Sequence, residues 1–137
     1  MSVIEKHWLT FQLIAALNQL HQNEIFHGDI KPENILLTSY NHLFITDMVN
    51  YKPIYVSIDD LKTFKTYFGE LDNTSRCYFA PERLVKKEEI DAKKKESVQL
   101  DAGISMDIFS VGCVIAEIHM EGEVLFSRSK LVMYKDK

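Results

Sequence analysis

The sequence lacks several features that would assign it to a simple functional class. It has only two cysteines, Cys77 and Cys113, without metal-ligand spacing, which is typical of small core residues in a reducing compartment. Its net charge of -4 lacks the basic excess of proteins that bind nucleic acids or membrane surfaces directly. We therefore expect no nucleic-acid partner and, at most, an indirect association with a membrane.

Targeting signals are equally scarce. The N-terminal "MSVIEKHWLT" has neither the basic and apolar segments of a secretory signal nor the second-position glycine of a myristoylation signal. No apolar run approaches the roughly 18 residues that cross a bilayer. The 137 residues, 46% hydrophobic and 26% charged, suit a single globular domain, which we expect in the cytoplasm.

Two helices are predicted, one near each end of the chain. Apolar residues at three- and four-residue steps mark the first: Ile4, Trp8, Phe11 and Ala15, with Leu13, Leu17 and Leu20 beside them. Ser2 and Glu5 have the spacing of a capping box, so this helix should begin almost at the first residue. The second, residues 105–121, is apolar on nearly every side, which predicts a buried helix that ends near Gly122.

Short strands and irregular segments lie between these helices. Two apolar runs in residues 25–37 flank a polar loop in which Pro32 prevents a helix, and residues 42–47 form another strand-like run. We therefore expect hairpin-like strands around a rigid polar turn. Residues 48–80 show no sustained period, and the charged insert, residues 86–97, predicts a solvated loop or a short exposed helix.

The polar loop carries the residue types that phosphoryl transfer requires. It lies in "HGDIKPENILLT", residues 27–38. This reaction needs a group that orients the attacking hydroxyl, a cation near the transferred phosphate and oxygen ligands for magnesium. Asp29, Lys31 and Asn34 could meet these needs in turn. Asp47 could supply a second metal ligand, because a hairpin after Asn34 would bring the two residues together.

Four motifs in order resemble those of eukaryotic protein kinases. They are "HGDIKPEN", "ITD", "YFAPERL" and "MDIFSVG", which look like the catalytic loop, the metal-binding aspartate, the Ala-Pro-Glu motif and the buried-helix anchor of that family. The resemblance implies a partial protein kinase domain over residues 1–137. Its fold would be mainly α with short β hairpins, a kinase-like C-terminal lobe that lacks the upper lobe and the end of the lower lobe.

The resemblance implies roles for the polar residues. In the catalytic loop, residues 27–34, Asp29 would be the catalytic base and Lys31 would contact the transferred phosphate of ATP. Asn34 and Asp47 would bind the nucleotide by holding magnesium ions. The expected cofactors are therefore ATP and Mg²⁺.

It also implies supporting roles for four residues outside the chemistry. His27 would pack beneath the catalytic loop, and Asp107 would hydrogen-bond the backbone of the loop from below. Glu82 would pair with an arginine late in the lower lobe. Ser75, in the activation segment (residues 47–82), stands where serine/threonine kinases often carry a threonine that touches the catalytic loop. This position favours serine/threonine specificity over the alternative of a simple loop serine.

Two departures from the kinase pattern bear on regulation. Gly28 replaces the arginine common in this loop, which removes the cation that would clamp a phosphorylated activation segment. We therefore do not expect control by phosphorylation of that segment. Val49 stands where the Asp-Phe-Gly motif has its glycine, and a β-branched residue should restrict the backbone there.

These departures, with "YKP", "TSRCYFAPERL" and "MDIFSVGCVIAEI", resemble a narrower family. It comprises the vacuolar-protein-sorting regulatory serine/threonine kinase subunits of class III phosphatidylinositol 3-kinase complexes. Membership would imply a kinase domain that binds and activates the lipid kinase catalytic subunit in autophagy and endosomal or vacuolar sorting. Its location would be cytoplasmic, peripheral on endosomal or vacuolar membranes as part of the complex.

Three functions fit these residues. An active protein kinase would use all four polar residues, whereas Gly28 and Val49 favour a weak or inactive pseudokinase scaffold that binds and activates the lipid kinase. An unrelated binding module would require Asp29 and Asp47 to lie far apart. Since phosphoryl transfer depends on positioning in a complete cleft, we expect the 137-residue chain alone to be inactive and to expose apolar surface.

Overall fold

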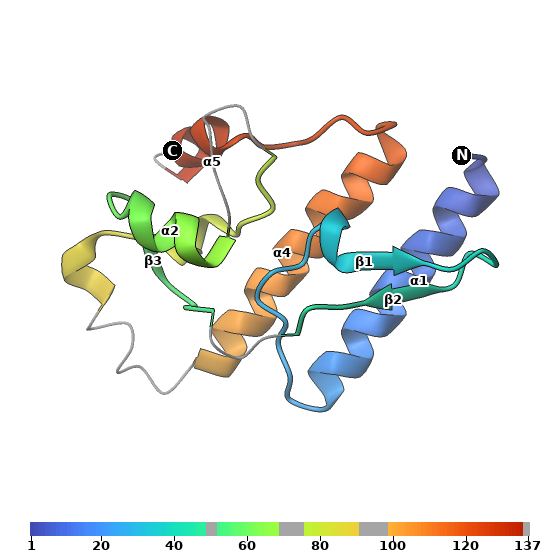
Figure 1. The fold of residues 1–137 in the computed structure, drawn as a ribbon, viewed down its shortest axis with the longest axis horizontal. Coiled ribbons are helices and arrows are strands. Elements are labelled where there is room, and N and C mark those ends of the chain that lie inside the picture. Colours follow the sequence, from blue (N-terminus) through green and yellow to red (C-terminus); the bar gives the residue numbers. More distant parts are fainter. Residues whose placement is uncertain (49–51, 69–75, 91–98, 136–137) are drawn as a thin grey trace.

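The computed structural model describes residues 1–48, 52–68, 76–90 and 99–135, and helices dominate it (Figure 1). The helices described are α1 (Val3–Gln22), α2 (Leu61–Phe68), α4 (Gln99–His119) and α5 (Arg128–Lys135). The strands form two two-stranded sheets: β1 (Ile35–Leu37) with β2 (Leu43–Ile45), and β3 (Val56–Ser57) with β4 (Leu84–Val85). Short 3-10 helices cover Pro32–Asn34, Pro81–Arg83 and Lys87–Glu89. The predicted fold class is confirmed.

Helix α1 begins as predicted, but only the leucine side of its predicted apolar stripe is buried. Glu5 N donates to Ser2 Oγ (3.2 Å) and Ser2 N donates to Glu5 Oε2 (2.6 Å), which completes the capping box. Ile4 and Phe11, on the predicted stripe, are 81% and 62% exposed. The side of α1 that contacts α4 and β2 carries the buried leucines, Leu9, Leu13 and Leu17. A helix that is apolar on more than one side does not reveal from its own sequence which side will be covered.

The β1–β2 hairpin follows the polar loop rather than bracketing it. Strands β1 and β2 are antiparallel, with Ile35 opposite Ile45. The backbone N–H of Thr46 donates to the carbonyl of Asn34 (2.9 Å), so the end of the hairpin returns to the loop. The first predicted strand, near Ile25, is wrong. The N–H of Ile25 instead donates to the carbonyl of Leu20 (3.1 Å), and this bond helps to end helix α1.

Helix α2 lies in a segment where the sequence showed no sustained period. Asp60 caps its start, because Thr63 N donates to Asp60 Oδ1 (2.9 Å). Phe64 and Phe68, one turn apart, then pack against Phe79, with ring centroids 4.9 Å and 4.6 Å from it. Eight residues are too few for a period to stand out, but the cap and the aromatic pair were readable signals.

Helix α4 is longer than the predicted residues 105–121 at its start and is buried on one side only. Ile108 is 55% exposed and Gly112 is exposed, which corrects the expectation of burial all round. The buried side carries Met106, Asp107, Ser110, Val111, Cys113, Val114 and Glu117. By length and composition alone Leu100–His119 could cross a membrane, as many core helices could, so the expectation of no such segment was too strict. The chain turns after the helix at Gly122, which has φ of +96°.

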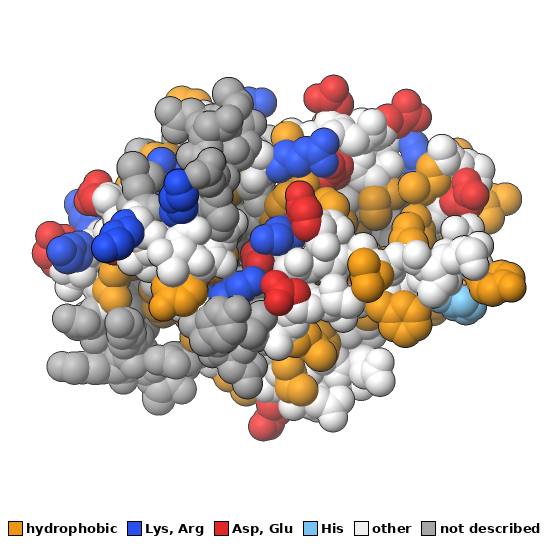
Figure 2. Space-filling model, in the orientation of Figure 1, with side chains coloured by type: hydrophobic (Ala, Val, Ile, Leu, Met, Phe, Trp, Pro, Cys, Tyr) orange, Lys and Arg blue, Asp and Glu red, His pale blue; other side chains and the backbone are white. Residues whose placement is uncertain are grey.

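Two apolar clusters organise the described residues. One joins α1, α4 and the hairpin through residues such as Leu13, Ile30 and Val114, and the other joins α2, α5 and the β3–β4 pair through Val56, Leu84 and Leu131. Figure 2 shows apolar side chains also gathered on the surface of the β1–β2 hairpin. The predicted exposed apolar surface is therefore present. The catalytic loop lies between the two clusters. Ile30 belongs to the first cluster, and the carbonyl of Gly28 accepts a hydrogen bond from Arg83, the residue before Leu84 of the second cluster.

Candidate active site

The catalytic loop is tied to α4 by one buried carboxylate. Asp107, 1% exposed, accepts hydrogen bonds from His27 N (2.6 Å) and from Gly28 N (2.8 Å). His21 Nε2 lies 3.2 Å from the same carboxylate. Gly28 has φ of +76°, a conformation that glycine adopts without strain. Two consecutive peptide groups of the loop are therefore fixed from below, in the arrangement that the kinase resemblance implied for Asp107.

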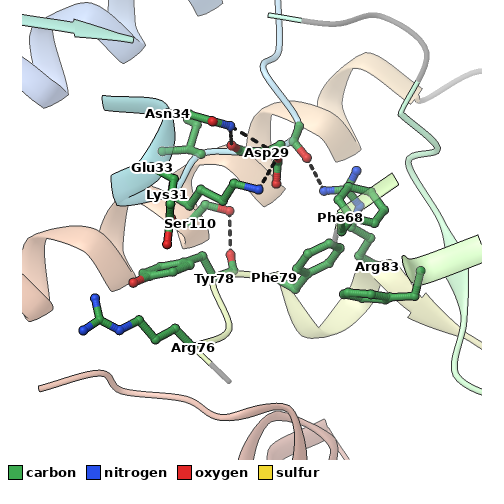
Figure 3. Close-up of a pocket in the computed structure, with 13 residues that line it drawn as sticks. Asp29, Lys31, Glu33, Asn34, Phe68, Arg76, Tyr78, Phe79, Arg83 and Ser110 are labelled. Carbon is green, nitrogen blue, oxygen red and sulfur yellow. Dashed lines mark hydrogen bonds and ion pairs between the residues drawn. The ribbon is translucent and has the colours of Figure 1, made fainter. Parts of the chain in front are cut away.

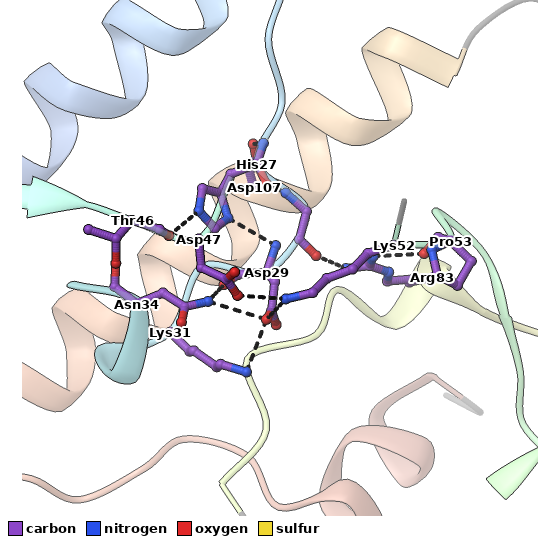
Figure 4. A network of polar contacts seen from close by, with 11 residues as sticks. His27, Asp29, Lys31, Asn34, Thr46, Asp47, Lys52, Pro53, Arg83 and Asp107 are labelled. Carbon is purple, nitrogen blue, oxygen red and sulfur yellow. Dashed lines mark hydrogen bonds and ion pairs between the residues drawn. The ribbon is translucent and has the colours of Figure 1, made fainter. Parts of the chain in front are cut away.

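The ring of His27 connects the loop to the end of the hairpin (Figure 4). His27 Nε2 lies 2.8 Å from the carbonyl oxygen of Thr46, and Asp29 N donates to His27 Nδ1 (3.2 Å). Because a carbonyl oxygen can only accept, Nε2 carries the hydrogen and Nδ1 is the acceptor. In this tautomer both ring nitrogens form hydrogen bonds, so His27 connects Asp29 to Thr46, the residue before Asp47.

Asp29 is the centre of the polar network. Its side chain is 4% exposed, and its Oδ2 atom lies 3.0 Å from Lys31 Nζ. Asn34 Nδ2 donates to the Asp29 backbone oxygen (2.8 Å) and to Oδ2 (3.2 Å). Pro32 opens the 3-10 helix that brings Asn34 back toward Asp29. Among the described residues nothing donates to the second oxygen, Oδ1.

Asp47 joins this network through a residue that sequence reasoning missed. Lys52 Nζ lies 2.6 Å from Asp29 Oδ2 and 3.0 Å from Asp47 Oδ2, so one ammonium group bridges both aspartates (Figure 4). The hydrogen bond from Lys52 lowers the pKa of Asp47. Burial acts to lower the pKa of Lys52, but the two aspartates outweigh it and the pKa is raised. A module in which Asp29 and Asp47 lie far apart is therefore excluded.

The oxygen donors near Asp47 suit magnesium in chemistry. Asp47 offers a half-exposed carboxylate. Asn34 uses its side-chain amide nitrogen on Asp29, and its side-chain oxygen, Oδ1, accepts no hydrogen bond from another described residue. The described residues hold no cluster of three or more His, Cys, Asp or Glu side chains that could bind a metal by themselves. Magnesium at Asn34 and Asp47 would therefore need water or phosphate oxygens to complete its shell.

Arg83 brings a guanidinium group next to Gly28, the position where the kinase pattern has an arginine. Its side chain donates to the carbonyl of Gly28 and to the carbonyl of Pro53 (2.8 Å), and it lies 4.7 Å and 4.8 Å from the centres of the Phe68 and Phe79 rings. A β-carbon on Gly28 would lie 3.7 Å from this guanidinium. Burial lowers the pKa of Arg83 to about 10, although Asp29 and Asp107 act to raise it. A backbone clamp thus joins the loop to the activation segment without a phosphate.

A cavity of about 520 Å³ opens in front of Asp29 (Figure 3). Asp29, Lys31 and Asn34 form its polar wall. The opposite wall is aromatic and consists of Phe64, Phe68, Tyr78 and Phe79. Tyr78 is fixed by a hydrogen bond from its hydroxyl to Glu117 Oε2 (2.5 Å), and burial together with that carboxylate raises the pKa of Tyr78. The catalytic-loop side chains and this aromatic surface therefore face one cavity.

Two predicted site residues remain: one is described and lies outside this network, and the other is not among the described residues. Glu82 is exposed and makes no ion pair with another described residue, so its expected arginine partner stays a prediction. Ser75 and Val49 lie outside the described residues, as does most of the charged insert 86–97. The described start of that insert forms the short 3-10 helix Lys87–Glu89 and is exposed.

Lys52 and Arg83 belong to kinase-like motifs but were not recognised as site residues. Lys52 stands in "YKP" and Arg83 in "YFAPERL". A search for a cation that could replace the arginine absent at position 28 would have pointed to Arg83, because this residue directly follows the Ala-Pro-Glu motif. No local pattern marks Lys52, because its role depends on how the chain folds back after Asp47.

Comparisons with known proteins identify the family of the chain. The model of the protein kinase domain matches residues 3–136. Serine/threonine-protein kinase VPS15 of Arabidopsis thaliana is 44% identical over an alignment of 137 positions. The alignment covers 98% of this chain and 9% of that protein. The Saccharomyces cerevisiae protein of the same name is 44% identical over 133 residues, 96% of this chain and 9% of that protein. Serine/threonine-protein kinase vps15 of Schizosaccharomyces pombe is 39% identical over an alignment of 137 positions, which covers 98% of this chain and 7% of that protein. The chain thus spans less than a tenth of the length of these relatives.

Proposed function

The chain belongs to the protein kinase family, and we propose that the protein transfers the γ-phosphoryl group of ATP to serine or threonine hydroxyls of a protein substrate. One observation carries this proposal: Asp29, Lys31 and Asn34 meet around a single carboxylate oxygen. This is the arrangement that orients a hydroxyl nucleophile and neutralises a transferred phosphate. The names of the similar proteins support the serine/threonine class.

The roles of the residues follow from their contacts. Asp29 Oδ1 would accept the hydrogen bond of the substrate hydroxyl, while Lys31 would turn from Oδ2 toward the phosphate oxygens. Asn34 and Asp47 would hold Mg²⁺, which would supply charge neutralisation on the phosphates of ATP. His27 and Asp107 would keep the loop in place without touching substrate.

We further propose that the protein works as a regulatory subunit of a class III phosphatidylinositol 3-kinase complex. In this role it would bind the lipid kinase catalytic subunit and act in autophagy and endosomal or vacuolar sorting. It would be cytoplasmic and would reach endosomal or vacuolar membranes through the complex. The sequence resemblance supports this proposal, and the exposed apolar side chains on α1 and the hairpin, such as Phe11 and Phe44, are consistent with partner surfaces.

A second function, a pseudokinase scaffold, is favoured by the Arg83 clamp. Arg83 joins Gly28 to Pro53 by constant backbone contacts, whereas kinases regulated by phosphorylation use a phosphate-binding arginine at this place. In that case the catalytic residues would serve nucleotide binding alone. The protein would then activate the lipid kinase without transferring phosphate.

The Asp29→Asn variant of the full-length protein separates these functions. It keeps the size of the side chain and removes the carboxylate, and exposed Asp59→Asn is the matched control. An active kinase should lose at least about a hundredfold in phosphate incorporation from labelled ATP, since a positioned base contributes roughly that much. A scaffold should show no incorporation with or without the substitution, and should stimulate the lipid kinase equally in both forms. Incorporation that survives Asp29→Asn would refute the assigned chemistry.

A further inference from the structure

Lys52 occupies a position that its neighbours make unusual for a lysine. Its side chain is only 7% exposed and reaches between the two aspartates, with Nζ 2.6 Å from Asp29 Oδ2 and 3.0 Å from Asp47 Oδ2 (Figure 4). Pro53, the next residue, is held by Arg83 through its carbonyl oxygen (2.8 Å). The backbone that carries Lys52 is therefore anchored, and the ammonium group is aimed at the two carboxylates.

We propose that Lys52 is the resident cation of this site and that a divalent metal ion binds Asp47 only by displacing the Lys52 ammonium group. A magnesium ion binds a carboxylate oxygen at about 2.1 Å and requires an ordered shell of oxygens around itself. The ammonium group already lies 3.0 Å from Asp47 Oδ2, and because both oxygens belong to one carboxylate, an ion on either of them would lie close to it. Two cations so close would repel each other strongly, so they cannot share this carboxylate.

The charge count of the site supports the same competition. Lys31 and Lys52 balance Asp29 and Asp47, so the four groups together carry no net charge to attract a metal ion. Asp29 Oδ2 is also fully engaged, because it receives Asn34 as well as the two lysines. Without Lys52, two carboxylates would face each other across the same space, which is the charge arrangement that favours a divalent cation.

The inference rests on the proposed function only for the identity of Asp47 as a metal ligand. Its test needs no phosphoryl transfer and no nucleotide. If the protein fails to phosphorylate any substrate but the competition is seen, the kinase proposal fails and this one stands. If phosphorylation occurs and no competition is seen, the opposite holds.

The probe is Mn²⁺ alone, whose free concentration is read from its electron paramagnetic resonance signal. In the full-length protein, Lys52→Met should bind Mn²⁺ at least about tenfold more tightly than the wild type, and Asp47→Asn added to it should abolish the gain. Lys62→Met, which removes an exposed lysine of α2, should match the wild type. Equal Mn²⁺ affinity of Lys52→Met and the wild type would overturn the proposal.

A second measurement decides the matter if Lys52→Met does not fold, as judged by circular dichroism. Because a metal ion on Asp47 would release the Lys52 ammonium group, saturating Mn²⁺ should raise the acetylation of wild-type Lys52 by an amine-reactive reagent severalfold, as read by mass spectrometry, while exposed Lys62 reacts equally with and without Mn²⁺. If Asp47→Asn weakens Mn²⁺ binding but Mn²⁺ leaves the acetylation of Lys52 unchanged, the metal reaches Asp47 without displacing the ammonium group, and the proposal is wrong.

Discussion

Replacing Arg83 by methionine tests the clamp that joins the catalytic loop to the activation segment. Arg83 is 4% exposed, and its guanidinium donates to the carbonyls of Gly28 and Pro53 and stacks on two aromatic rings. Hydrogen bonds from a charged donor contribute about 1.5 to 3 kcal/mol each. The cation–π contacts contribute about 2 kcal/mol when they are buried, as here. Methionine keeps most of the apolar stem but leaves both carbonyls without these donors.

An opposing term reduces the expected loss. Burial lowers the pKa of Arg83 to about 10, and its Nε atom has no hydrogen-bond partner among the described residues. At about 1.4 kcal/mol for each pKa unit, keeping the charge in this place costs about 3 kcal/mol, which methionine would avoid. The net destabilisation by Arg83→Met should therefore be about 3 kcal/mol, which corresponds to a fall in melting temperature of about 10 °C for a chain of this length.

The assay is thermal unfolding followed by circular dichroism, with proteolysis at the activation segment as a local readout. Arg83→Lys is the matched comparison, because it keeps the charge but cannot bridge two carbonyls, and it should lie between wild type and Arg83→Met. Arg83→Met protein that is as stable as the wild type would refute the clamp. That result would mean that the hydrogen bonds only offset the cost of burying the charge, as happens for some buried ion pairs.

Two further substitutions test the packing around the site. Gly103→Ala should destabilise the protein by about 1 to 3 kcal/mol, because a β-carbon would lie 2.5 Å from the ring of Phe26, whereas Gly112→Ala in the same helix meets nothing within 4 Å and should stabilise it by about 0.5 to 1 kcal/mol. Equal melting temperatures for the two variants would contradict the close approach of Phe26 to α4. Tyr78→Phe should cost about 1 to 3 kcal/mol in chemical denaturation, since it leaves the buried Glu117 carboxylate without its hydroxyl donor. No change would mean that water replaces the hydroxyl.

The elements that could be predicted from the sequence are those whose signal is local. The capping box at Ser2 and Glu5 needs only four residues to form, and it was found. The face of α1 that is buried could not be predicted, because it depends on where α4 and the hairpin lie. Similarly, α4 carries apolar residues on most sides, and only its packing against α1 decides that Ile108 stays exposed.

The residues of the candidate site likewise fall into those that are close in the sequence and those that are distant. Asp29, Lys31 and Asn34 lie within six residues of one another, so their spacing alone could suggest a common site, and the structure brings them together. Lys52 could not be found in this way, because it lies 23 residues from Asp29 in the sequence. Long-range contacts of this kind leave no periodic trace in a single sequence.

The absence of an arginine at position 28 and the presence of Arg83 are structurally linked. Gly28 has a positive φ and no side chain, which leaves its carbonyl open to the guanidinium and keeps a β-carbon out of contact with it. An arginine at position 28 would bring a further cation beside Arg83 and Lys52, within a site whose carboxylates are already balanced. The glycine is therefore consistent with a loop that receives cations from the activation segment and from the residue after the Ala-Pro-Glu motif. On this argument Gly28→Arg should disrupt the clamp rather than restore a phosphate-binding site, because a residue other than glycine is strained at this positive φ and the added charge would repel Arg83.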